Sequence, residues 1–170
     1  MTPASHTIST ARLVLRPALP GDLDVLLVMR DAAPDPTREE RIRALLAANA
    51  VAFAVHGFGL WLVLADGRAA GFVGLRPREW ASEPELFYGL APDARGRGFA
   101  TEAARAVIDL LFTAPGVTGA WAVTDPPNLA SCRVLERLGM RLELEGEFDG
   151  KPSRVYRLRR PRGTGPGAAG

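Results

Sequence analysis

The sequence contains few of the residues that build covalent or metal-based scaffolds. Cys132 is the single cysteine and there are two histidines, so the chain cannot form an internal disulfide or supply a cysteine-based structural zinc site. No apolar run reaches the roughly 18 residues that a membrane span needs. Residues 1–10 also lack the basic and apolar regions of a signal peptide. These absences predict a protein of the reducing cytoplasm, with no membrane partner and no metal.

Composition and charge are those of an ordinary globular protein. The chain has 170 residues, of which 47% are hydrophobic and 24% charged, and this length predicts one domain. We place the domain at residues 10–160 and expect the Gly-, Pro- and Ala-rich residues 161–170 to be disordered. Lys151 is the only lysine among 21 basic residues, and the net charge is +2. The arginines form no basic face with aromatic platforms, so a nucleic acid partner is not expected.

The hydrophobic pattern predicts a mixed α/β domain. Alternating apolar residues predict seven strands, at residues 11–16, 60–65, 70–75, 85–90, 119–124, 140–148 and 153–159. Helical spacing and capping residues predict four helices, at residues 21–30, from 37 to before 57, at 101–112 and at 128–138. Asp-Gly pairs at 66–67 and 149–150 are typical of tight hairpin turns. We therefore expect a mostly antiparallel sheet of about seven strands, flanked by about four helices.

One segment carries a chemical signal, at the junction between a predicted strand and a predicted helix. Leu90 ends the strand, Arg95, Gly96, Arg97 and Gly98 follow, and the helix begins at once. Free amide N–H groups at a helix N-terminus bind anions, and glycines let a phosphate approach the main chain closely. A Walker A loop is excluded because no lysine is present here, and the third glycine of a Rossmann fingerprint is missing. Taken alone, the loop is equally consistent with a glycine-rich surface loop carrying solvated arginines.

The same segment resembles the pyrophosphate loop of the GNAT superfamily of N-acetyltransferases. Arg95, Gly98 and Ala100 match its Gln/Arg-x-x-Gly-x-Gly/Ala pattern. The segments at 58–61, 71–75, 85–92, 128–131 and 135–140 are similar to the RimJ/RimL-like subgroup, the ribosomal-protein alanine N-acetyltransferases. These pieces occur in the order and spacing that the subgroup has, so the resemblance covers roughly residues 10 to 160.

The resemblance implies an acetyl-CoA-dependent N-acetyltransferase that binds no metal and needs a primary amine as acceptor. Acetyl-CoA would lie in a V-shaped opening between the strands that end near residues 90 and 124. Its pyrophosphate would bind the amides of the loop. The implied cofactor-binding residues are Leu90, Arg95, Gly96, Arg97, Gly98, Phe99, Ala100, Thr101, Asn128 and Ser131.

The resemblance also implies two catalytic residues. Glu85 would remove the amine proton through water, with Glu83 as the alternative, and Ser131 would donate a hydrogen bond to the departing thiolate. Many family members carry a tyrosine for this second task, but Leu135 stands at that position. Tyr88 is a second possible donor. Both residues also have an interpretation without a catalytic role: Glu85 as a surface glutamate, and Ser131 as a serine that caps the helix.

Several functional questions stay open at this level. The acceptor could be a protein N-terminal α-amine or a small-molecule amine, and the protein could be a monomer or a homodimer. The missing tyrosine also keeps open a catalytically weak or inactive CoA-binding protein with a regulatory or binding role.

Overall fold

The computed structural model describes residues 6–29 and 36–161. In chain order, the described elements are β1 (Ile8–Ser9), β2 (Leu13–Pro17), α1 (Leu23–Val28), α2 (Pro36–His56), β3 (Leu60–Ala65), β4 (Arg68–Arg78), β5 (Ala81–Leu90), α3 (Phe99–Leu111), β6 (Gly119–Thr124), α4 (Leu129–Arg137), β7 (Arg141–Phe148) and β8 (Lys151–Arg159). Short 3-10 turns precede α1 and follow β5. This order confirms the predicted mixed α/β fold.

The strands form one sheet in the order β1-β2-β3-β4-β5-β6-β8-β7. Every neighbouring pair is antiparallel except β5 and β6, which run parallel. The two predicted Asp-Gly turns are present, and all four residues have positive φ, from 51° at Asp66 to 74° at Gly67 and Gly150. Such left-handed pairs match the twist of a two-residue hairpin.

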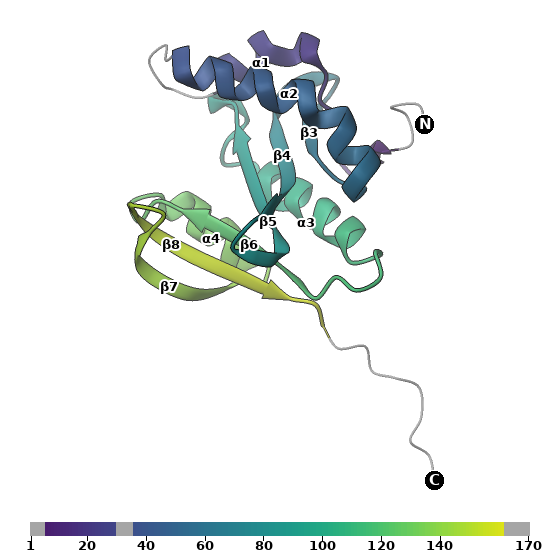
Figure 1. The fold of residues 1–170 in the computed structure, drawn as a ribbon. Coiled ribbons are helices and arrows are strands. Elements are labelled where there is room, and N and C mark those ends of the chain that lie inside the picture. The colour runs from purple at the N-terminus through teal and green to yellow at the C-terminus, as the bar shows by residue number, and fades with distance from the viewer. Residues whose placement is uncertain (1–5, 30–35, 162–170) are drawn as a thin grey trace.

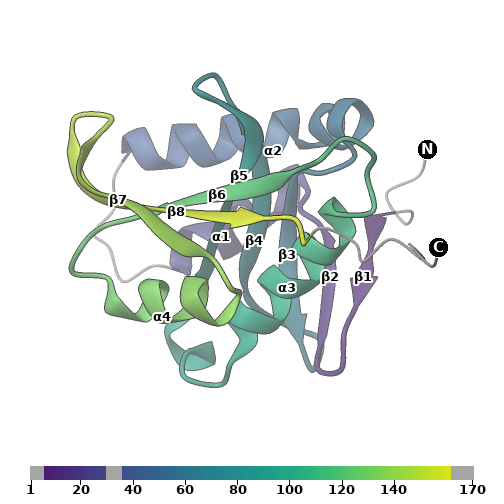
Figure 2. The ribbon, with the colours of Figure 1, turned by 90° about the horizontal axis from the view of Figure 1, so that it is seen from below.

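The two faces of the sheet are covered by different helices (Figures 1 and 2). On one face, α1 and α2 pack through Leu26 and Leu46 onto Leu60 and Leu62 of β3. On the other face, α3 and α4 bury a larger apolar cluster that includes Val107 and further residues of both helices. Most of the free energy that holds the layers together comes from removing these apolar side chains from water.

A partly buried ion pair fixes the chain where it leaves β2. The Arg16 guanidinium donates to both carboxylate oxygens of Asp22, at 2.8 and 2.7 Å. The Leu19 N–H donates to the same carboxylate at 2.7 Å. The hydrogen bonds from Arg16 hold the pKa of Asp22 below its ordinary value, since they stabilise the charged form.

The structure departs from the predicted elements at a few places. It has eight strands among the described residues, because Ile8 and Ser9 pair with β2 as an additional short strand. Helix α3 begins at Phe99, two residues before the predicted start, and β4 and β5 extend through most of residues 76–84 as one long hairpin. Residue 30 of the first predicted helix and residues 162–170 of the predicted tail lie outside the described residues.

Candidate active site

A cavity of about 750 Å³ opens where the two parallel strands separate. The only register pair between β5 and β6 is Glu85 with Trp121. Beyond this pair the strands diverge, and the cavity is lined by residues 86–90 of β5 and by residues 122–125 at the end of β6. The edge of β5 that faces β6 therefore carries main-chain groups with no strand partner. This opening corresponds to the V-shaped gap that the resemblance implied.

Gly89, on this part of β5, provides close packing and not a bulge. The register between β4 and β5 is regular there, with Phe72 opposite Gly89. A Cβ atom at Gly89 would lie 2.7 Å from the Phe72 ring. A glycine inside a strand marks a bulge or a close backbone approach, and at Gly89 it allows the close approach.

The predicted anion loop lies at one end of the cavity. Gly96 and Gly98 have φ of 73° and 79°, in the left-handed region that favours glycine. The first helical hydrogen bond of α3 runs from the Glu102 N–H to the Gly98 carbonyl at 3.1 Å. The N–H groups of residues 99–101 come before this first helical hydrogen bond, so they have no acceptor within the helix. Together with the helix dipole, they make a favourable site for an anion.

The structure brings most of the predicted cofactor-binding residues to this cavity. Those that line it are Leu90, Arg95, Gly96, Gly98, Ala100, Thr101, Asn128 and Ser131. The side chains of Arg97 and Phe99 are not among the lining residues. Phe99 is 2% exposed and belongs to the core, and the Arg97 guanidinium lies 4.5 Å from the centre of its ring. These two residues contribute main chain to the loop, while their side chains pack beside it.

Two residues outside the predicted set hold the loop in place. The Arg12 guanidinium donates to the Arg97 carbonyl at 2.9 Å and pairs with Glu102 at 2.6 Å. The Thr10 hydroxyl donates to the same carboxylate at 2.6 Å. Although burial opposes ionisation of Glu102, these hydrogen bonds outweigh it and hold its pKa below the ordinary value. No local sequence signal links residues 10–12 to a loop some 85 residues later.

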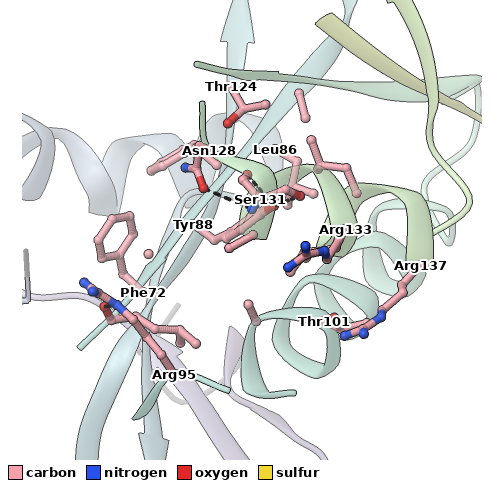
Figure 3. Close-up of a pocket in the computed structure, with 18 of the residues that line it drawn as sticks. Phe72, Leu86, Tyr88, Arg95, Thr101, Thr124, Asn128, Ser131, Arg133 and Arg137 are labelled. Carbon is pink, nitrogen blue, oxygen red and sulfur yellow. Dashed lines mark hydrogen bonds between the residues drawn. The ribbon is translucent and has the colours of Figure 1, made fainter. Parts of the chain in front are cut away.

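Basic side chains of α4 line the same end of the cavity (Figure 3). Arg133 and Arg137 are four residues apart and share one face of the helix. Neither guanidinium makes a hydrogen bond or ion pair within residues 6–29 and 36–161. The hydroxyl of Thr101 is buried and also lacks a hydrogen-bond partner in that part of the chain. Donors without partners therefore gather around the N-terminus of α3, as expected for a site that binds a polyanion.

Ser131 forms a small network with residues of two other segments (Figure 3). Its N–H donates to the Asn128 side-chain oxygen at 3.1 Å, which caps α4. Its hydroxyl lies 2.9 Å from the Tyr88 hydroxyl, which can also donate to the Ser131 carbonyl at 3.2 Å. Burial raises the pKa of Tyr88 to about 12, so this phenol stays protonated. Leu135, one turn further along α4, contributes only an apolar wall.

The two predicted bases, Glu85 and Glu83, do not line the cavity. Glu85 is 3% exposed, and its oxygens lie 2.8 Å from Arg76 and 2.9 Å from Arg78. Glu83 accepts hydrogen bonds from Arg157, Thr118 and Trp121. Burial opposes ionisation of Glu83, but these bonds leave its pKa below the ordinary value. The structure therefore brings Ser131, but neither glutamate, to the cavity wall.

The sequence matches a model of the acetyltransferase (GNAT) domain over residues 12–141. The chain belongs to the GNAT acetyltransferase family. This match covers the described sheet from β2 to the start of β7 and includes every predicted site residue. It confirms the resemblance drawn from the loop and from the segments around it.

Two curated relatives share part of this GNAT sequence. YkkB of Bacillus subtilis, an uncharacterised protein, is 34% identical over 105 residues, which are 59% of this chain and 61% of YkkB. The FsC-acetyl coenzyme A-N(2)-transacetylase of Aspergillus fumigatus is 29% identical over 154 residues, which are 81% of this chain and 66% of the relative. The chain therefore matches less than two thirds of the length of either relative.

Solved GNAT structures share the fold. An acetyltransferase of Agrobacterium tumefaciens has a TM-score of 0.77 and 25% identity, over 91% of this chain and 94% of that one. RimL, a ribosomal L7/L12 α-N-protein acetyltransferase solved in complex with coenzyme A, has a TM-score of 0.73 and 18% identity. The match covers 90% of this chain and 97% of RimL. The neighbours thus include the ribosomal-protein subgroup that the sequence resembled, and at this identity the likeness to RimL concerns the fold.

Two further observations bear on partners of this GNAT domain. Within the described ranges, no helix is both long and apolar enough to cross a membrane. The same residues hold no group of three or more His, Cys, Asp or Glu side chains placed to bind a metal ion.

Proposed function

We propose that this GNAT protein transfers the acetyl group of acetyl-CoA to a primary amine by direct attack, with both substrates bound at once. The observation that carries this proposal is the cavity between the diverging strands. One end offers the helix N-terminus and unpartnered cations, and its middle offers an unpaired strand edge and a hydroxyl. Family membership supports the cosubstrate, since acetyl or acyl transfer from CoA is the chemistry implied by the GNAT resemblance.

The phosphates of acetyl-CoA would bind at the loop end of the cavity. The amides of residues 96–101 would hold the pyrophosphate, with the Thr101 hydroxyl as a further donor. Arg95, Arg133 and Arg137 would supply positive charge, because a charge-assisted hydrogen bond to phosphate is roughly twice as strong as a neutral one. The pantetheine amides would pair with the free edge of β5 at residues 87–90, as an added strand does.

Ser131 is the proposed donor to the leaving group. The amine nitrogen attacks the thioester carbonyl carbon, the C–S bond breaks, and the electron pair stays on sulfur. A hydrogen bond from the Ser131 hydroxyl would stabilise the negative charge that develops on sulfur. Tyr88 supports this role because it can donate to the Ser131 oxygen and fix the hydroxyl hydrogen toward the sulfur.

Glu85 is proposed as a base that acts through water. Direct contact with the amine is not supported by its position, since both of its oxygens already face arginines and it does not line the cavity. A weak base suffices for an α-amine, whose pKa of about 7.7–8.0 leaves a sizeable neutral fraction near neutral pH. A lysine amine, with a pKa near about 10.4, is depleted in the neutral form by about a thousandfold. This difference favours N-terminal or small-molecule α-amines as acceptors.

Thiol release from acetyl-CoA tests the proposal. We expect the wild-type chain to bind acetyl-CoA and to release CoA when an acceptor amine is added. The variant Gly98→Glu should lose most of this affinity, because it adds bulk and negative charge beside the pyrophosphate and forces a non-glycine residue into positive φ. Glu79→Gln, in the hairpin between β4 and β5 and away from the loop, is the control. Unchanged acetyl-CoA affinity in Gly98→Glu would contradict the loop assignment.

A further inference from the structure

The cavity is lined from both faces of the sheet. The anion loop, Ser131 and the arginines of α4 reach it from the face that α3 and α4 cover. Met29, Phe72 and Phe87 line it as well, yet these three belong to or pack against the apolar cluster on the opposite face, beneath α1 and α2. Acetyl-CoA bound at the loop would therefore leave this second, apolar side of the cavity for the acceptor amine.

Asp125 lines the same cavity. It directly follows Thr124, the last residue of β6, and its side chain is exposed. The residue before a proline is held in an extended conformation, and Pro126 follows directly. The Asn128 N–H donates to the Asp125 carbonyl at 2.9 Å, which closes the turn into α4. The backbone at Asp125 is thus fixed before any substrate arrives.

Asp125 also differs from the two carboxylates of β5. Glu83 and Glu85 are paired with arginines and lie off the cavity. Among the described residues, Asp125 is the only carboxylate that lines it, and its side chain makes no hydrogen bond or ion pair within the described part of the chain. The other charged lining residues are Arg95, Arg133 and Arg137, all assigned above to the phosphates. Within residues 6–29 and 36–161, a positively charged acceptor therefore meets a single negative group in this cavity.

Apolar side chains form the rest of the acceptor side. The Phe72 and Phe87 rings lie 6.4 Å apart, and Met29 is 2% exposed. The Arg76 guanidinium lies 5.0 Å from the centre of the Phe87 ring and pairs with Glu85. A second cation on the acceptor that lay against these apolar groups would meet no counter-charge among the described lining residues. Burial of an unpaired charge in such surroundings is costly.

We propose that Asp125 binds the amino group of the acceptor, and that the acceptor is a monoamine with an apolar or aromatic group next to its nitrogen. Met29, Phe72 and Phe87 contact that apolar group. This inference rests on the proposed acetyl transfer and deepens it by naming the acceptor class. Polyamines and polycationic amines fit poorly, because a single carboxylate lines the cavity within the described residues.

Two amines of similar length test the inference. With the full chain and saturating acetyl-CoA, we expect kcat/KM for phenylalanine amide to exceed that for lysine amide, which has the same α-amine and a second cation, by about tenfold or more. Asp125→Asn should lower kcat/KM for phenylalanine amide by about tenfold to a hundredfold, the range for loss of a hydrogen bond to a charged group. The dissociation constant of acetyl-CoA should not change. Asp125→Glu should recover part of the loss, since it restores the charge.

The control is Asp109→Asn, which removes an exposed carboxylate of α3 outside this cavity and should leave both amines unaffected. Equal or better use of the diamine would overturn the inference, and so would an Asp125→Asn variant with normal amine kinetics. Acetyl-CoA binding without transfer to either amine would also overturn the acceptor class. Absence of acetyl-CoA binding in the wild-type chain would instead contradict the proposed function itself.

Discussion

Ser131 and Tyr88 share a hydrogen bond of 2.9 Å inside the cavity. We expect Ser131→Ala to lower kcat by about tenfold to a hundredfold, the lower part of the range for loss of a positioned proton donor. CoA thiolate is a fairly good leaving group, which limits the loss. Tyr88→Phe keeps the ring and removes the hydroxyl, so kcat should fall by about twofold to tenfold.

Steady-state kinetics with acetyl-CoA as the varied substrate measure both variants. The KM for acetyl-CoA should change little, because the donor acts on developing charge and not on the bound ground state. A fully active Ser131→Ala variant would remove this residue from the mechanism. A Tyr88→Phe variant that lowers turnover while Ser131→Ala does not would assign the donor role to Tyr88.

Glu85 has two candidate roles that differ in their pH dependence. If Glu85 is a base that acts through water, Glu85→Gln should lower turnover at neutral pH. The rate should recover at higher pH, where the neutral amine accumulates. Turnover measured at two pH values tests this, with Glu83→Gln as the comparison. An equal loss at both pH values would mean that Glu85 serves to hold Arg76 and Arg78 beside the point where β5 and β6 separate.

Local residue patterns predicted part of the site, and tertiary contacts determined the rest. The position of the loop from Arg95 to Thr101, between a strand and a helix, could be predicted because it depends on consecutive residues. Ser131 and Asn128 followed from a family resemblance at a helix start. The clamp at Arg12 and the lining by Asp125 could not be predicted, since each depends on how distant segments pack. Glu85 was placed in the correct strand, but its arginine partners come from the neighbouring strand.

At the scale of elements, the N-terminus of α3 depends on the strand that precedes α1. Arg12 ties Glu102 of the helix and the Arg97 carbonyl of the loop to the start of β2. We expect Arg12→Ala to weaken acetyl-CoA binding by about fivefold to tenfold, because the loop amides lose their fixed orientation. Calorimetric titration with CoA measures the effect.

Arg43→Ala is the matched control for this prediction. Arg43 also pairs with a carboxylate, Glu39, at 2.6 Å, but on the exposed face of α2. Its removal should leave CoA affinity unchanged. If both variants bind CoA as tightly as the wild type, the clamp does not organise the loop.

Element types were more predictable than element ends. The Asp-Gly turns and the amphipathic pattern of α3 are local signals, and both predictions are confirmed. The β4–β5 hairpin reaches beyond its predicted ends because buried Glu83 and Glu85 find arginine partners across the sheet. The alternating pattern starts the strand at Glu85 and leaves Glu83 outside it, and only the pairing with Arg157 of β8 shows that Glu83 belongs to the strand.

At the scale of the whole molecule, three carboxylates with arginine partners make the free energy of unfolding depend on pH. The pKa values of Asp22, Glu83 and Glu102 all lie below their ordinary values in the folded protein. Their contribution to the free energy of unfolding is therefore fully present above the ordinary carboxyl range of about 4. It is lost as the pH falls through the lower folded values, because the unfolded chain then binds more protons.

Urea unfolding at pH 7 and at pH 3 measures this loss. Asp22→Asn should cost about 2 kcal/mol at pH 7 and less at pH 3, where the unfolded chain already carries a proton on most of this carboxyl group. The variant should therefore show a shallower dependence of unfolding free energy on pH. An equal cost at both pH values would contradict the ion-pair explanation.

Where β5 separates from β6, the cavity interrupts the sheet and is lined by residues from both of its faces. Because the cavity is lined from both faces of the sheet, an acyl donor and an acceptor bound as proposed would enter from opposite faces and would not need to exchange places. Either product could then leave without the other. An inhibitor that joins CoA to an amine would have to thread this gap, so the width between the strands limits which linkers can fit.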